Sequence, residues 1–107
     1  MERFGLPEKT IERIRAVLAQ YPSIERAVIY GSRAKGTYKP GSDIDLVLFG
    51  QGLTETELLE LGSRLDDLLL PYTFDISRFE TLQNPQLLDH IQRVGKEFYS
   101  RVEGYRL

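Results

Sequence analysis

Apolar residues recur at the spacing of an amphipathic helix in three stretches of the chain. The first covers residues 7–20, where a proline suits the opening turn of a helix. The second begins behind Thr54, which together with Glu57 matches the capping-box pattern, and it stops at Pro71. The third follows Pro85 and ends or bends near Gly95. The pattern therefore predicts three helices, and their apolar stripes, including the leucines between 58 and 69, are expected to form the core.

Three shorter apolar runs predict strands over residues 24–30, 43–49 and 72–77. In the last run Tyr72, Phe74 and Ile76 share one face, because successive side chains of a strand point to opposite sides. The order is helix, strand, strand, helix, strand, helix. This order predicts an α+β fold with α/β character, in which helices back a small mixed sheet and one face of the sheet stays free.

The composition places the chain among globular proteins, with 107 residues, 41% hydrophobic and 28% charged. We expect one domain over residues 1–107 and no membrane-spanning segment, because the longest apolar run is too short. The N-terminus lacks a secretory signal pattern and there is no cysteine, which favours a cytoplasmic location. The net charge of −2 argues against broad nucleic-acid binding, which relies on a basic surface.

The segment from residue 31 to residue 45 carries the strongest chemical signal. It reads GSRAKGTYKPGSDID: a glycine–serine turn after a strand, a basic loop, and then two aspartates one residue apart. Asp43 and Asp45 share one face of a strand, and two carboxylates about 4 Å apart repel by about 4 kcal/mol at an effective dielectric constant of 20. A divalent cation removes this repulsion, and carboxylate oxygens suit Mg²⁺. The pattern indicates metal–nucleotide chemistry.

Asp75 is the third candidate, and it lies between Phe74 and Ile76 on the last predicted strand. We expect it to be at least partly buried, and therefore to need a cation, a hydrogen-bond network or a catalytic role. If its strand pairs beside the strand of Asp43, three carboxylates converge on one face and can hold two metal ions. The alternative is an edge-strand aspartate that faces solvent. His90, the single histidine, is interpreted as a structural or surface residue.

The chain resembles the nucleotidyltransferase superfamily of DNA polymerase β and kanamycin nucleotidyltransferase in one motif. The motif is Gly31-Ser32, then ten residues, then Asp43-Ile44-Asp45, with Asp75 on a later strand. In so short a chain, the segments GSRAKG and SDIDL and the tail LDHIQRVGK are most similar to the minimal nucleotidyltransferases. Those proteins are typically encoded beside a helical HEPN-type protein, often as the antitoxin of a toxin–antitoxin pair. The resemblance covers nearly the whole chain and implies the polymerase β-type nucleotidyltransferase fold.

The resemblance also implies a role for each matching residue. Asp43 and Asp45 hold the metal that carries the nucleoside triphosphate, and they share a second metal with Asp75, the general base or its nearest partner. The implied cofactor is Mg²⁺, two ions in number, with Mn²⁺ able to substitute, and ATP is the implied substrate. The implied nucleotide-binding residues are Gly31 and Ser32 on the β- and γ-phosphates, Arg33 or Lys35 on the leaving pyrophosphate, and Ser42, which either binds phosphate or merely begins the strand.

The function implied is transfer of AMP from ATP to a hydroxyl, most simply a tyrosine of a HEPN-type toxin encoded nearby, with the chain acting as antitoxin. One alternative is an antitoxin that neutralises its partner by binding alone, although clustered carboxylates have no use in a pure binder. Another is nucleotidylation of a small molecule. A chain of 107 residues leaves no room for an acceptor domain, so the acceptor surface comes from another chain, in a homo- or hetero-oligomer.

Overall fold

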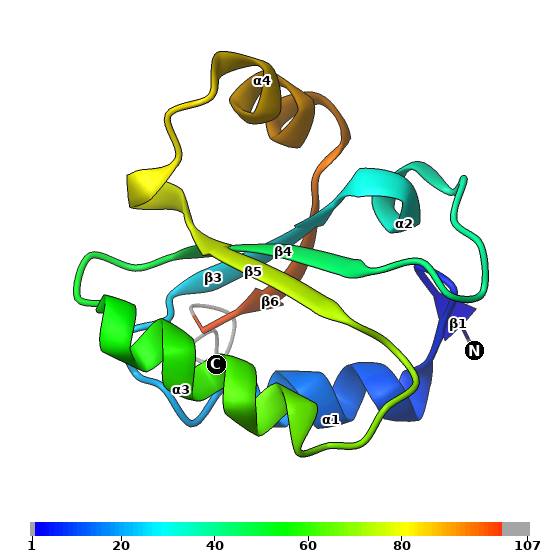
Figure 1. Ribbon diagram of the computed structural model, residues 1–107, viewed down its shortest axis with the longest axis horizontal. Helices are drawn as coiled ribbons and strands as arrows, with labels where there is room; N and C mark the ends of the chain where they lie inside the picture. The colour runs from blue at the N-terminus through cyan, green and yellow to red at the C-terminus, as the bar shows by residue number, and fades with distance from the viewer. Residues whose placement is uncertain (1, 102–107) are drawn as a thin grey trace, which may run out of the picture.

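A computed structural model describes residues 2–101 of the chain. A four-stranded sheet forms its centre, with strands in the order β5-β4-β3-β6 (Figure 1). The strands are β3 (Arg26–Tyr30), β4 (Ile44–Phe49), β5 (Phe74–Arg78) and β6 (Lys96–Ser100). The helices are α1 (Glu8–Leu18), α2 (Gly31–Lys35), α3 (Glu55–Asp66) and α4 (Pro85–Val94), with a short 3₁₀ turn η1 (Phe79–Thr81). Two short strands, β1 (Glu2–Arg3) and β2 (Leu6–Pro7), form a separate hairpin before α1.

The sheet is mixed. Strand β3 pairs antiparallel with both β4 and β6, whereas β4 pairs parallel with β5. The parallel pair needs a crossover connection, and α3 supplies it. The register sets Tyr30 opposite Asp45, and Asp45 opposite Asp75, so these three residues form one row across the sheet. The mixed α+β fold predicted from the sequence is confirmed.

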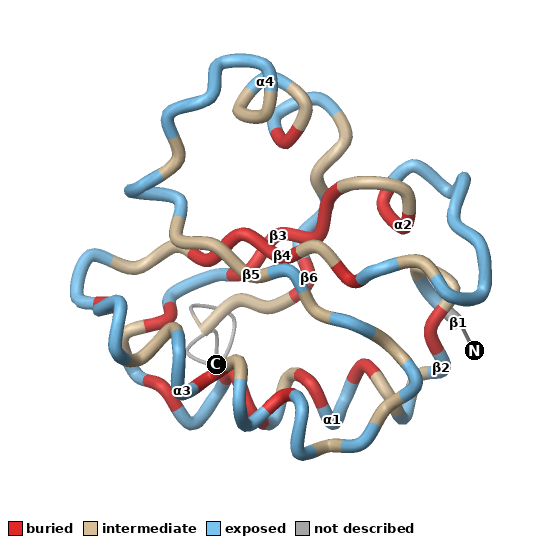
Figure 2. Tube along the Cα trace, in the orientation of Figure 1, coloured by how far each residue is buried: buried red, intermediate tan, exposed pale blue. Residues whose placement is uncertain are grey.

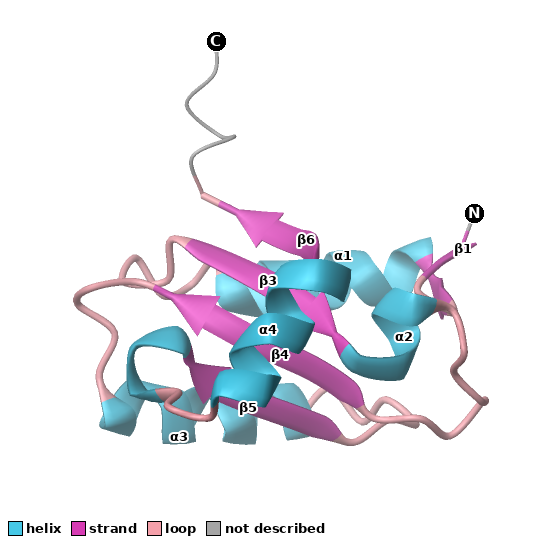
Figure 3. Cartoon of the chain, turned by 90° about the horizontal axis from the view of Figure 1, so that it is seen from above, coloured by secondary structure: helices cyan, strands magenta, loops and turns pink. Residues whose placement is uncertain are grey.

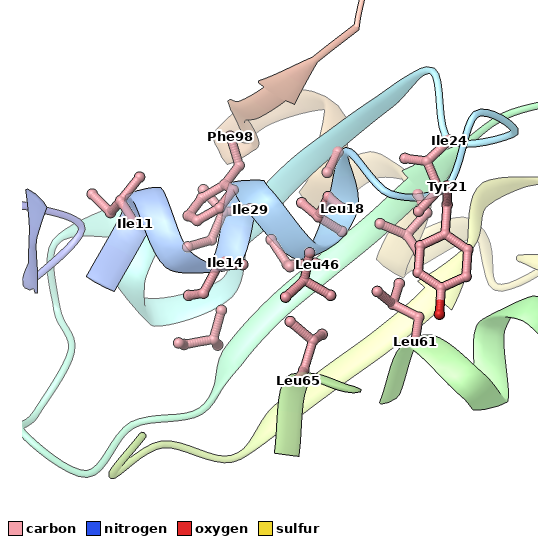
Figure 4. Close-up of a cluster of buried hydrophobic side chains, with 14 of the residues drawn as sticks. Ile11, Ile14, Leu18, Tyr21, Ile24, Ile29, Leu46, Leu61, Leu65 and Phe98 are labelled. Carbon is pink, nitrogen blue, oxygen red and sulfur yellow. The ribbon is translucent and has the colours of Figure 1, made fainter. Parts of the chain in front are cut away.

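The main core lies between the sheet and the layer formed by α1 and α3, on one side of the sheet (Figures 1 and 4). Helix α1 buries the four residues of its predicted stripe, and α3 buries Leu61 and Leu65. The sheet contributes alternate residues, such as Ile44 and Leu46 of β4. Figure 2 shows how burial concentrates in β3 and β4, the two central strands. Thr54 and Glu57 form the predicted capping box, with both reciprocal hydrogen bonds present.

The opposite face of the sheet carries α4, which crosses above the strands in Figure 3. Ile91 of α4 packs with Val28, Tyr30 and Val47 in a second, smaller cluster. The expectation of a free sheet face is therefore wrong, because an apolar side of α4 needs a partner and finds it there. Among the described residues, no helix is long and apolar enough to cross a membrane.

Several elements differ from the sequence prediction. The Gly31-Ser32 turn opens the short helix α2, and β6 was not predicted at all. Asp43 lies one residue before β4, and α3 ends at Asp66, so the leucine stripe stops early. Leu69 is 87% exposed and has a φ of 56°, which shows that it is not a core residue. We predicted a single domain over residues 1–107. Residues 1 and 102–107 lie outside the described part of the chain.

Candidate active site

The three predicted aspartates lie on or next to the paired strands β4 and β5, which Figure 1 shows side by side. Asp45 is on β4, with Asp75 beside it on β5 and Asp43 two residues earlier in the chain. The side chains of Ile44 and Leu46 belong to the core, so Asp45 points to the other face of the sheet, the face that carries α4. Asp45 is half-buried, whereas Asp43 and Asp75 are exposed. The prediction of a partly buried Asp75 is wrong: β5 is the edge of the sheet, and its outer face meets solvent there.

The charges of the three carboxylates interact. Burial, followed by the negative charges of Asp75 and then Asp43, raises the pKa of Asp45 from its ordinary value of 3.8 to about 6. The guanidinium of Arg33 opposes this rise only in part. Ionising Asp45 therefore costs free energy, because the charged carboxylate is partly buried and lies near two other carboxylates. Groups with a pKa raised in this way are typical of sites that bind a cation or exchange a proton.

Tyr30 completes the row beside Asp45 and is 7% exposed. Burial raises the pKa of its hydroxyl, a hydrogen bond with Ser77 lowers it, and the charges of Asp75 and Asp45 raise it again. Tyr30 therefore remains a neutral phenol at physiological pH. Its place in the row gives Asp45 an aromatic neighbour on β3 and a carboxylate neighbour on β5.

Gly31 provides the space that the carboxylate of Asp45 occupies. Its φ is +74°, in the left-handed region that favours glycine, and a Cβ built on it would lie 2.3 Å from Oδ2 of Asp45. Any larger residue would therefore displace the carboxylate or the turn. This close approach places the glycine–serine turn beside Asp45. The binding of phosphate by Gly31 and Ser32 stays a prediction.

Arg33 has a different position from the one predicted. Its side chain is buried, with the residue 2% exposed, and it lies near the rings of Tyr38 and Tyr72. Its Nε and Nη2 atoms donate to the carbonyl oxygen of Ser42 at 3.1 and 2.9 Å. Nη1 donates to the carbonyl of Phe4 at 2.9 Å and to that of Gly5 at 3.4 Å, and Nη2 makes a further contact of 3.4 Å with the carbonyl of Pro40.

The prediction that the guanidinium of Arg33 faces the phosphates is thus corrected. The guanidinium donates to carbonyl groups of the loop over residues 36–43 and of the N-terminal hairpin. Because Arg33 is buried, a nucleotide in solution has no access to its side chain. The sequence shows a basic residue near a phosphate-binding turn but gives no sign of the carbonyl groups that surround it. Arg33 instead anchors the residue that precedes Asp43.

Lys35 and Ser42 were also predicted to bind the nucleotide. Lys35 is exposed at the end of α2, and its role toward phosphate stays a prediction. Ser42 accepts a hydrogen bond through Oγ from the amide of Lys39 at 2.8 Å, which ties the loop before Asp43. Its hydroxyl proton is not used by that bond, so both readings of Ser42 remain open.

His90, interpreted from the sequence as a structural or surface residue, contacts the glycine–serine turn. It projects from α4 and accepts, through Nε2, a hydrogen bond from the amide of Gly31 at 3.1 Å. Its ring also meets the ring of Tyr30 edge to face, with 6.1 Å between centroids. The interpretation as a structural residue fits these contacts, but nothing in the sequence near residue 90 indicated which group it contacts.

The donor set suits a hard divalent cation. Asp45 and Asp75 lie opposite each other on adjacent strands, with Asp43 two residues before Asp45, and a cation there would offset the carboxylate repulsion that adds to burial in raising the pKa of Asp45. Within residues 2–101, no group of three acidic or histidine side chains stands at metal-binding spacing. The three carboxylates supply the oxygen ligands that such a cation prefers, and to hold it the exposed side chains of Asp43 and Asp75 would have to turn toward Asp45.

A cleft of about 410 Å³ lies on the same sheet face, but at the far end of β4. It is lined by residues of α4 and by Phe49 and Phe79, whose rings stack 4.5 Å apart. None of the three aspartates lines it. We assign the chemistry to the aspartates rather than to this cleft, because they are the ionisable groups with coupled charges.

The fold and the carboxylates together define a class of proteins, the nucleotidyltransferases that use paired aspartates after a glycine–serine turn. The family model described as "Polymerase beta, Nucleotidyltransferase" matches residues 12–104. The chain belongs to this family. No curated protein sequence matches it closely enough to count as a relative.

Solved structures share the fold. A chain of a toxin–antitoxin complex crystallised with AMP-PNP is 21% identical, with a TM-score of 0.68, and the match covers 92% of this chain and 77% of that one. A second match comes from a complex of a tri-AMPylated HEPN toxin of Shewanella oneidensis with its MNT antitoxin, at 17% identity and a TM-score of 0.66, covering 91% and 75%. A candidate nucleotidyltransferase from Sulfolobus solfataricus is 21% identical, with a TM-score of 0.59, covering 92% and 85%.

Proposed function

We propose that the protein transfers AMP from ATP to a hydroxyl group of a HEPN-type partner protein, and that it acts in this way as an antitoxin. The observation that carries the proposal is the row formed by Asp45 and Asp75 on adjacent strands, with Asp43 two residues away and Gly31 shaped to admit the carboxylate of Asp45. Burial and then the charges of Asp75 and Asp43 raise the pKa of Asp45, and a bound cation would oppose this rise. A protein that only binds a partner gains nothing from this arrangement.

In the proposed reaction the acceptor oxygen bonds to the α-phosphorus while the bond from that phosphorus to the pyrophosphate breaks. The hydroxyl proton passes to Asp75 or to a group that it orients, because Asp75 is exposed on the outer strand where a second protein can approach. Asp43, Asp45 and Asp75 would hold two Mg²⁺ ions, with Mn²⁺ able to substitute. When bound, the metal ions supply charge neutralisation and activation of the acceptor hydroxyl.

The chain's other residues have supporting roles in the proposal. Ser32 contacts the β- or γ-phosphate, and exposed Lys35 neutralises charge on the pyrophosphate as it leaves. Arg33 contributes indirectly, since it holds the carbonyl of Ser42 and so the entry to Asp43. A location in the cytoplasm, where ATP is available, belongs to the same proposal.

The comparisons support the proposed partner. A structural neighbour is a chain of a complex with AMP-PNP, and another comes from a complex in which the HEPN toxin is tri-AMPylated. These support ATP as substrate and a protein as acceptor. We further propose a tyrosine as the acceptor, in a hetero-oligomer with the HEPN-type protein.

Two alternatives remain as outcomes of the test. In one, the protein neutralises its partner by binding alone. In the other, it modifies a small molecule with a site completed by a partner chain. Both predict that the HEPN-type partner gains no AMP, and the first also predicts that the partner is neutralised without ATP.

The test is incubation of the protein with ATP, Mg²⁺ and the HEPN-type protein encoded beside it, followed by intact-mass spectrometry. The proposal expects the mass of the partner to rise by one or more AMP groups. Asp75→Asn is expected to stop the transfer while sparing ATP binding, because it changes the chemical step. Asp66→Asn, an exposed aspartate on α3, is the matched control and should transfer normally. An unmodified partner after incubation with the wild-type protein refutes the proposal.

A further inference from the structure

His90 connects α4 to the catalytic end of the sheet. Ile91 packs α4 onto the second face of the sheet. The side chain of His90, the preceding residue, reaches the junction between β3 and α2. There its Nε2 accepts the amide hydrogen of Gly31 at 3.1 Å. A nitrogen that accepts carries no proton, so the bond fixes the tautomer with hydrogen on Nδ1. The edge-to-face contact with Tyr30 holds the ring from a second side.

The residue that His90 holds is in contact with the metal-binding row. The Cα of Gly31 approaches the carboxylate of Asp45 so closely that an added Cβ would be 2.3 Å from Oδ2. Because glycine has no Cβ, the backbone of Gly31 has more conformational freedom than that of other residues, and its φ of +74° lies in the left-handed region. A hydrogen bond from outside the turn restricts that freedom. The amide of Gly31 is held by a side chain 59 residues further along the chain.

We propose that His90 is a positioning residue for the nucleotidyl transfer: it fixes the Gly31-Ser32 turn, and through Gly31 the carboxylate of Asp45, in the geometry needed for reaction. The inference rests on the proposed function. It also changes the role of Gly31: its amide serves α4, and its missing side chain makes room for Asp45, so contact with phosphate falls to Ser32.

A positioning role predicts a pattern that a merely structural histidine would not give. Removing the acceptor loosens one turn without removing any ligand of ATP or metal. The ground-state affinity for ATP then changes little, while the rate falls, because reaction needs near-ideal placement of the reacting groups. A glutamine at position 90 should restore the rate, since its Oε1 reaches about as far as Nε2 of histidine and accepts the same hydrogen bond.

The test compares His90→Leu, which removes the acceptor, with His90→Gln, which keeps it. Gln86→Leu, an exposed change on the first turn of α4, is the matched control. Amide hydrogen exchange at Gly31, read by NMR in the protein without nucleotide, should be roughly tenfold faster in His90→Leu than in wild type. In His90→Gln and in the control it should stay within about threefold of wild type.

The same variants are then assayed for ATP binding by titration calorimetry and for AMP transfer to the HEPN-type partner in a single turnover. We expect His90→Leu to transfer at least tenfold more slowly with the dissociation constant of Mg²⁺–ATP within about threefold of wild type, and His90→Gln to recover most of the rate. Unchanged Gly31 exchange in His90→Leu overturns the proposal. So does a loss of rate that glutamine fails to restore, or a loss that appears entirely as weaker ATP binding.

Failure of the proposed function gives a different result. If the wild-type protein transfers no AMP, the transfer reaction is refuted, and His90 is judged by the Gly31 exchange rate, a measurement that needs no activity. An unchanged exchange rate in His90→Leu then refutes the positioning role as well.

Discussion

Replacing Asp45 by asparagine should make the metal-free protein more stable at neutral pH. Burial and the charges of Asp75 and Asp43 raise the pKa of Asp45 from 3.8 to about 6. A carboxyl group whose pKa is higher in the folded state favours folding most while it is protonated. That contribution is complete below pH 3.8 and is lost as the pH rises through about 6. At pH 7.5 the ionised group therefore opposes folding.

The magnitude follows from the same pKa values. A difference of about two pKa units, at about 1.36 kcal/mol per unit, sets an upper bound of about 3 kcal/mol. Because Asp45 is only half-buried, solvent screens part of this, and we expect a gain of about 1–2 kcal/mol in the free energy of unfolding for Asp45→Asn. Asp75→Asn should give a smaller gain and Asp43→Asn the smallest, in the order of their effects on the pKa of Asp45.

The assay is urea denaturation in EDTA at pH 7.5 and at pH 4, with exposed Asp66→Asn as the control. The gain should be present at pH 7.5 and nearly absent at pH 4, where Asp45 is largely protonated in wild type. Adding Mg²⁺ should stabilise wild type and not Asp45→Asn, and so reduce or reverse the difference. A variant that is less stable than wild type in EDTA at pH 7.5 would refute the reasoning, as would an equal gain at both pH values.

Three further changes separate structural from chemical roles. Arg33→Ala should lower the free energy of unfolding by about 2–4 kcal/mol, because it leaves part-buried carbonyl groups without donors. Urea titration measures this change, and a stability within about 0.5 kcal/mol of wild type would contradict the prediction. Lys35→Ala should weaken ATP binding by about 1–3 kcal/mol with an unchanged melting temperature, and unaltered affinity in calorimetry would make Lys35 an ordinary surface charge. Gly31→Ala should cost about 1–2 kcal/mol of stability and abolish transfer, since its Cβ would meet Asp45; an active Gly31→Ala would show that the carboxylate is not fixed there.

Periodicity predicted the larger elements because each one buries a continuous stripe. The residues that α1 buries are those that recur at helical spacing, and the apolar face of β5 packs on the core as its alternation indicated. The pairing of Asp45 with Asp75 was predictable in outline, because both lie on predicted strands that a small sheet can bring side by side. The shared face expected for Asp43 was not, because Asp43 lies one residue before β4. The exposure of Asp75 was not, since it depends on β5 lying at the sheet edge.

The missed features depend on contacts between distant parts of the chain. Helix α2 has five residues and no apolar repeat, so its sequence looks like a turn. Strand β6 has only Phe98 fully buried, between charged and polar neighbours, and it gains its hydrogen bonds from β3, about 70 residues earlier. Arg33 and His90 bind backbone groups, and a backbone group leaves no mark in the amino-acid sequence.

The place of β6 has a consequence for synthesis of the protein on the ribosome. Residues 96–100 form the outer strand beside β3, and Phe98 fills part of the main core. A nascent chain that has emerged only as far as α4 carries every aspartate of the site, yet its β3 still has an open edge and its core a missing aromatic ring. Open strand edges recruit other chains. The folded nucleotidyltransferase domain therefore forms only when residues 96–100 are free to pair with β3, and a chain truncated near residue 95 would expose a strand edge that favours aggregation.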